Sequence, residues 1–100
     1  MNIDLAKAMP RVILQDQATV NGWQGNLILT DEEIRFERPG LPPGYFVVVF
    51  EAPLTAVSLV VEGTFRKKLL ITDQRNRKSF SVEVRNVKEW LKMVTVVKGG

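Results

Sequence analysis

The chain has 100 residues, 45% of them hydrophobic and 25% charged, with a formal net charge of +3, a composition typical of one globular domain. It contains no cysteine and no histidine, which excludes disulfides, Cys/His zinc sites, thiolate nucleophiles and imidazole acid–base catalysis. The charge is uneven, because residues 1–63 hold four basic and eight acidic side chains whereas residues 64–100 hold ten basic and three acidic ones.

Residues 1–10 contain few apolar side chains and predict a loose segment or a short helix that ends at Pro10. Asp4 and the lack of a long apolar run distinguish this segment from a secretory signal peptide. The longest apolar run of the chain covers residues 46–50, far short of the ~20 residues of a membrane span. We therefore expect a cytoplasmic protein, with peripheral membrane association as an open alternative.

Residues 11–20 predict a first strand, in which the polar run 15–17 indicates a bulge or exposure to solvent. Residues 21–25 predict a turn, since Gly22 and Gly25 accept positive φ angles. Residues 26–30 and 34–37 alternate apolar and polar side chains on either side of the acidic turn 31–33. This alternation predicts a hairpin with one face toward water.

Three prolines and two glycines in residues 39–44 predict a stiff, exposed loop. The next segment, residues 45–50, reads Tyr-Phe-Val-Val-Val-Phe and is apolar on both parities. A strand with two apolar faces is typical of a central or covered position. We predict such a strand here, ended by Pro53.

Residues 57–62, 65–72 and 79–84 predict three further strands, separated by turns at 63–64 and 73–77. Residues 86–97 predict an amphipathic helix, with Asn86 as N-cap and Glu89 at the capping-box position. Apolar side chains at helical spacing define its buried stripe: Val87, Trp90, Leu91 and Val94. This spacing places Trp90 in the core.

The chain is therefore predicted to be one mainly β domain over residues 1–100, with about seven antiparallel strands in residues 11–85 and one C-terminal helix in 86–97. A short chain with this many strands avoids two long bare edges by closing into a bent barrel or two near-orthogonal sheets. The amphipathic helix can then close one open corner with Trp90.

This pattern resembles the pleckstrin-homology-like (PH-like) superfamily, and within it the GRAM and bacterial PH-type domains. Those domains open with a glycine, a strand of the form x-L-x-L-T, a polar turn and a strand that ends in an aromatic residue. The matching residues here are Gly25, Leu27, Leu29, Thr30, Ile34 and Phe36. The closing strand with an alternating aromatic residue is matched by Phe80, and the helix that buries an aromatic residue is matched by Trp90.

The resemblance covers residues 11–97 and implies a PH-like bent barrel that serves as a non-enzymatic binding module. Members of the superfamily bind phosphoinositides, other anionic lipids or proteins. Phosphoinositide-binding members usually place Lys and Arg around the loop between the first two strands. That loop, residues 21–25, has no basic residue here, so no lipid-site residue is transferred.

Two basic groups are candidate binding residues: Arg66, Lys67, Lys68, Arg75, Arg77 and Lys78. The predicted register places them at the base and tip of one hairpin. On one surface they would attract anionic membrane lipids or nucleic-acid phosphates, or they form a solvated hairpin that keeps an edge from pairing. Trp23 is a candidate anchor for a partner or for a membrane interface, with capping of the barrel end as the alternative.

The sequence favours a non-enzymatic adaptor module that binds another protein, with anionic lipid through the basic hairpin 66–78 as the first alternative. Nucleic-acid binding through the same basic surface is the second alternative. A homo-oligomer formed through a sheet edge is also open, because a β-domain can add a strand to an exposed edge. No cofactor, metal site or catalytic residue is predicted.

Overall fold

The computed structural model describes residues 11–99, so the prediction for residues 1–10 lies outside the described part of the chain. It contains seven strands, a short 3₁₀ turn η1 and a C-terminal helix α2. The bounds are β1 Val12–Val20, β2 Trp23–Thr30, β3 Glu33–Pro39, β4 Phe46–Pro53, η1 Leu54–Ala56, β5 Val57–Glu62, β6 Lys68–Asp73, β7 Lys78–Val84 and α2 Val87–Gly99.

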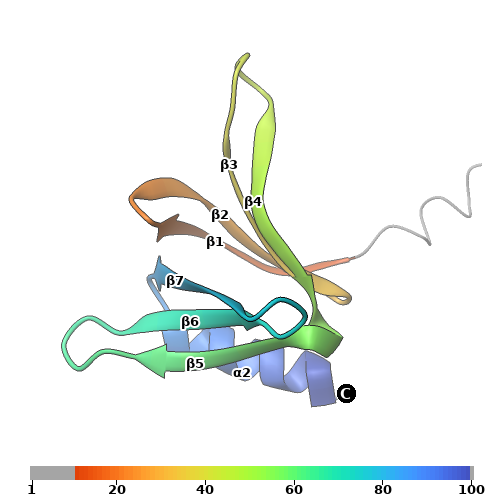
Figure 1. The fold of residues 1–100 in the computed structure, drawn as a ribbon, viewed down its shortest axis with the longest axis vertical. Helices are drawn as coiled ribbons and strands as arrows, with labels where there is room; N and C mark the ends of the chain where they lie inside the picture. Colours follow the sequence, from red (N-terminus) through yellow and green to blue (C-terminus); the bar gives the residue numbers. More distant parts are fainter. Residues whose placement is uncertain (1–10, 100) are drawn as a thin grey trace, which may run out of the picture.

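All seven strands belong to one antiparallel sheet with the order β4-β3-β2-β1-β7-β6-β5. The sheet is strongly bent. Three strands separate β4 from β7 in the sheet order, yet Phe50 of β4 stacks on Phe80 of β7 with ring centroids 4.3 Å apart. β1–β4 rise on one side of this bend, and β5–β7 lie on the other with α2 beneath them (Figure 1). The mainly β fold with one closing helix is confirmed, and it is consistent with a PH-like bent barrel.

The core lies inside the bend and is closed by α2. The helix packs on β5, β6 and η1. Its buried residues are Val87, Trp90 and Val94, as the helical spacing predicts, whereas the fourth residue of the predicted stripe, Leu91, is half-buried and lies outside the core. Trp90 is completely buried, and its indole Nε1 donates a hydrogen bond to Asp16 Oδ2 of β1 at 2.8 Å. α2 ends at Gly99, two residues beyond the predicted end.

The first turn is shorter than predicted. It consists of Asn21 and Gly22, both at positive φ (52° and 81°), and Trp23 already belongs to β2. Gly25 lies within this strand, where a Cβ would come within 2.1 Å of the Glu37 carbonyl oxygen. Gly25 is therefore required by the close approach of β2 and β3 rather than by a turn.

The exposure predicted for the polar run 15–17 is confirmed for Gln15 and Gln17, and the register irregularity of β1 lies elsewhere, between Val12 and Leu14. Two further details differ from the prediction. Ile28 and Thr30, on the face of β2 that was predicted to meet water, are buried. The sixth strand begins at Lys68 rather than at Phe65. Phe65 lies in the preceding loop, where its side chain is 99% exposed.

The prediction that residues 45–50 form a central or covered strand is wrong for the single chain. β4 is an edge strand, at one end of the sheet order. Only its second half, from Val49 onward, reaches the core, and residues 45–48 are exposed. A strand that is apolar on both faces is expected to be buried on both faces. Within the described chain, no element packs on residues 45–48 of this segment.

Candidate functional site: the β3–β4 hairpin

The two basic groups lie at opposite ends of β6. Arg66 and Lys67 are in the β5–β6 loop, and Arg75 and Arg77 are in the β6–β7 turn. Six strand residues separate the two groups, a distance of about 17–20 Å. The predicted positions at the base and tip of one hairpin are therefore found, but the cations do not gather into one cluster.

Arg75 serves the fold. Its Nε and Nη2 donate to the Asp73 carboxylate at 3.0 and 2.9 Å, and Nη2 also donates to the Glu51 carbonyl oxygen of β4 at 3.3 Å. These bonds hold the pKa of Asp73 below its usual value and raise that of Arg75. Arg75 thus ties the β6–β7 turn to the far edge of the sheet.

Lys68 is also paired, since its Nζ lies 3.2 Å from Glu83 Oε1 on β7. The remaining candidate cations, Arg66, Lys67, Arg77 and Lys78, are exposed. Only Arg66 and Lys67 adjoin an exposed aromatic side chain, that of Phe65.

Trp23 does not fold back over the barrel end. Its side chain is 55% exposed, and the Arg38 guanidinium of β3 lies 4.4 Å from the centre of its ring. Stacking on Arg38 fixes the indole on the surface. The ring therefore lies on the surface beside the outer half of the β3–β4 hairpin, where Arg38 opposes Val47.

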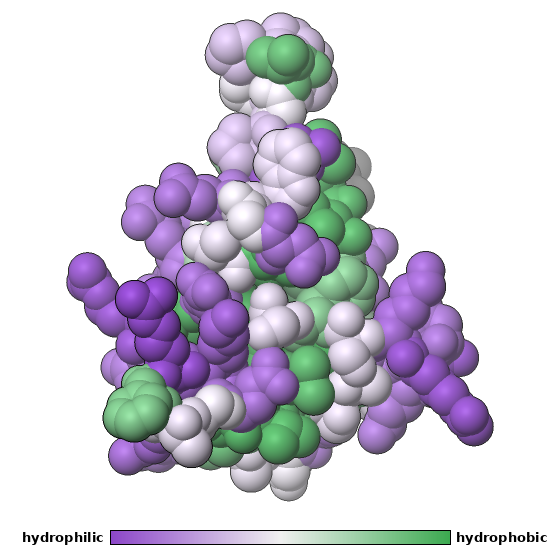
Figure 2. All heavy atoms as spheres, turned by 60° about the vertical axis from the view of Figure 1, so that its left-hand side comes forward, coloured by the Kyte–Doolittle hydropathy of each residue, from purple (hydrophilic) through white to green (hydrophobic). Residues whose placement is uncertain are grey.

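The main apolar surface of the described chain is at the outer half of this hairpin, which projects from the body (Figure 1). Five side chains there are between 42% and 91% exposed, and we call them the hairpin patch: Leu41, Tyr45, Phe46, Val47 and Val48. Figure 2 shows hydrophobic atoms that extend from the projecting tip down one side of the hairpin. Contiguous apolar surface of this kind marks interaction sites on soluble domains.

The hairpin patch occupies both faces of β4. Phe46 and Val48 oppose Pro39 and Glu37 of β3, while Val47 opposes Arg38. Since successive residues of a strand point to opposite faces, Val47 lies on the face away from Phe46 and Val48. Sequence reasoning recognised the two-sided apolar pattern of residues 45–50 but assigned it to the core.

The two edges of the sheet differ in how they are protected. At the β5 edge, α2 packs nearby and Lys98 Nζ donates a hydrogen bond to the Val57 carbonyl. At the β4 edge, the Arg75 contact to Glu51 lies beyond the hairpin patch. Residues 45–50 contain neither a charge nor a proline, two features that usually protect an edge strand, although a register irregularity of β4 lies beside Val48. β4 is therefore the edge with the larger exposed apolar surface.

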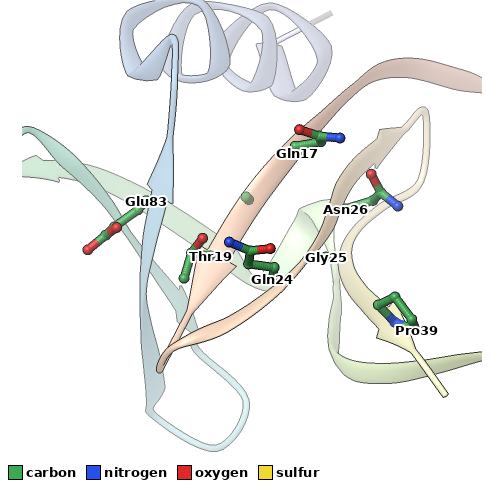
Figure 3. Close-up of a pocket in the computed structure, with 8 residues that line it drawn as sticks. Gln17, Thr19, Gln24, Gly25, Asn26, Pro39 and Glu83 are labelled. Carbon is green, nitrogen blue, oxygen red and sulfur yellow. The ribbon is translucent and has the colours of Figure 1, made fainter.

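A groove of about 360 Å³ lies on the β1–β2 face, and half of the residues that line it carry an amide or a hydroxyl side chain (Figure 3). Gln17 pairs across the strands with Asn26, and Thr19 pairs with Gln24. Glu83 is the single ionisable residue in the lining. The groove thus offers hydrogen-bonding groups. Its lining contains one carboxylate rather than the pair that carboxylate acid–base catalysis would use.

The acidic turn 31–33 has a structural explanation. Thr30 Oγ1 accepts hydrogen bonds from the backbone N–H groups of Glu32 and Glu33 at 3.1 and 3.0 Å. Burial, followed by the charge of Glu51, raises the pKa of Glu33. Within residues 11–99 no group of three acidic side chains is arranged to hold a metal ion.

Comparison with known proteins finds no matching family model and no matching curated sequence. Over the described residues, no helix is long and apolar enough to cross a membrane.

Proposed function

We propose that this chain is a PH-like binding module that recognises another polypeptide as an added strand along β4. The observation that supports this proposal is the hairpin patch on an edge strand of the sheet. An added strand forms main-chain hydrogen bonds with the edge, and alternate side chains of the hairpin patch supply apolar contact. No catalytic chemistry is proposed.

The exposed apolar area of the hairpin patch is that of a modest binding site. From the exposed fractions of its five members, the hairpin patch offers on the order of 500 Å² of apolar surface. This is near the upper end of the largest patch on a typical monomer. It is about the area that one partner contributes to a small, reversible complex.

A peptide selection tests the proposal. Random linear peptides displayed on phage are selected against the immobilised chain, and the enriched peptides are measured by fluorescence polarisation. We expect extended apolar sequences whose binding is lost in V48K but retained in V60K. Val48 and Val60 are both exposed valines on edge strands, on β4 and β5 respectively. Selected peptides that bind V48K as well as the natural chain would refute the assignment to β4.

A second function is favoured by one specific observation in the β5–β6 loop. Phe65 is almost completely exposed and is followed by the exposed cations Arg66 and Lys67. An aromatic side chain beside cations suits docking to an anionic membrane, where each cation contributes about 1 kcal/mol. Nucleic-acid binding is less well supported, because the six candidate cations do not form one surface.

Vesicle sedimentation distinguishes this second function from the first. Binding to phosphatidylserine-containing vesicles that falls with salt and is lost in the R66E/K67E variant would support membrane docking through this loop. The matched control is R77E/K78E, at the opposite end of β6. Equal loss in both variants would indicate non-specific attraction, and no sedimentation at low salt would refute the membrane function.

A further inference from the structure

We infer that the strand added at the β4 edge is β4 of a second copy of this chain, so that two copies form an antiparallel, two-fold dimer. This inference rests on the proposed function, because it uses the same β4 edge and names its occupant. Three observations support it: the sequence of β4, the position of the hairpin and the difference between the two sheet edges.

The sequence of β4 is self-complementary. Residues 46–50 read Phe-Val-Val-Val-Phe in both directions. A two-fold interface requires a surface that complements itself. Two antiparallel copies of this segment, aligned about Val48, bring apolar side chains opposite apolar side chains, with Phe50 of each copy packed in its own core. Residues 46–50 carry no charge, so this alignment places no like charges opposite each other, which would destabilise the paired strands.

The position of the hairpin allows two copies to approach. The outer half of β3 and β4 projects beyond the rest of the molecule (Figure 1), so the edge at residues 45–48 can be reached by an approaching chain. The hairpin patch lies on both faces of β4. A neighbouring β4 therefore covers apolar side chains on each face, which a flat surface contact would not do.

The difference between the two edges limits the assembly to a pair. The β5 edge carries the Lys98 contact to the Val57 carbonyl, and Val60 is its one exposed large hydrophobic residue, whereas β4 exposes Phe46, Val47 and Val48. Pairing through β4 uses the same surface on both copies and leaves no second β4 edge for a third. Such isologous contacts give closed dimers rather than filaments.

The expected affinity is modest. About 500 Å² of apolar surface per copy gives a total near the lower limit for specific complexes. We therefore expect a reversible dimer with a dissociation constant on the order of micromolar. Monomer and dimer then exchange over the concentrations that sedimentation experiments cover.

Sedimentation equilibrium of the natural chain, V48K and V60K tests the inference. We expect the natural chain and V60K to share one monomer–dimer equilibrium, whereas V48K weakens dimerisation by about a hundredfold or more, because two ammonium groups are brought into the paired edge. Val48 opposes Glu37 in its own hairpin, so a lysine there has a partner and the monomer keeps its fold. Circular dichroism checks this.

Hydrogen exchange provides a test that needs no variant. Amides of residues 46–48 should exchange more slowly as the concentration of the natural chain rises, while amides of 57–62 should not change. A chain that is monomeric at all concentrations, or a V60K variant as impaired as V48K, overturns the inference. If the chain is monomeric but selected peptides still bind β4, the proposed function stands without the dimer; if neither occurs, both fail.

Discussion

Replacement of Trp90 tests how the helix is held to the sheet. The indole is completely buried and donates to Asp16 Oδ2 at 2.8 Å across 74 positions of sequence. W90F keeps an aromatic ring but removes the donor, which costs about 1.5–3 kcal/mol for a bond to a carboxylate. The lost ring volume adds about 1–2 kcal/mol. The expected total is a large part of the ~5–15 kcal/mol stability of a domain.

A double-mutant cycle separates the hydrogen bond from the packing. Urea unfolding followed by far-ultraviolet circular dichroism gives the free energy of unfolding of the natural chain, W90F, D16A and W90F/D16A. We expect a coupling energy of about 1–2 kcal/mol between the two sites. D16N is the matched control, since its amide oxygen still accepts from the indole and should retain most of the stability. A coupling below about 0.3 kcal/mol would refute a stabilising role for this bond.

Three further predictions concern stability. G25A should destabilise the chain by about 1–3 kcal/mol in the same urea assay, because its Cβ would meet the Glu37 carbonyl oxygen at 2.1 Å. Unchanged stability would contradict the close approach of β2 and β3. The depressed pKa of Asp73 beside Arg75 adds stability at neutral pH that is lost as pH falls below about 3.9. D73N should lose this pH dependence. A D73N variant whose stability falls with acid as steeply as that of the natural chain would contradict the prediction. Burial raises the pKa of Glu33, so its ionisation opposes folding at neutral pH. E33Q should therefore be more stable than the natural chain at neutral pH, and the difference should disappear below about pH 4. A less stable E33Q at neutral pH would contradict the raised pKa.

Local patterns were sufficient to predict the fold class. The spacing of Val87, Trp90 and Val94 gave the buried face of α2, and the alternation around residues 31–33 gave the β2–β3 hairpin. Both signals arise from residues close in sequence. The contact between Trp90 and Asp16 has no such signal, because it depends on how a helix and a distant strand meet.

The candidate site was less predictable for the same reason. The two basic groups are close in sequence, but an extended strand of six residues separates them in space. Arg75 reads as a free cation in the sequence, yet it is bound by Asp73 and by the Glu51 carbonyl. The sequence shows which side chains are charged, whereas pairing across the bend decides which of them remain available to a ligand.

The error at residues 45–50 bears directly on the proposed dimer. Their two-sided apolar pattern is that of a buried strand, and in the single chain the first half of this strand is exposed. A pattern that predicts burial is satisfied equally by cover within one chain and by cover from another. The alternating strand 79–84, by contrast, has one apolar face, which finds its cover in the core. If β4 pairs with a second copy, its sequence is explained by the assembly rather than by the fold of one chain.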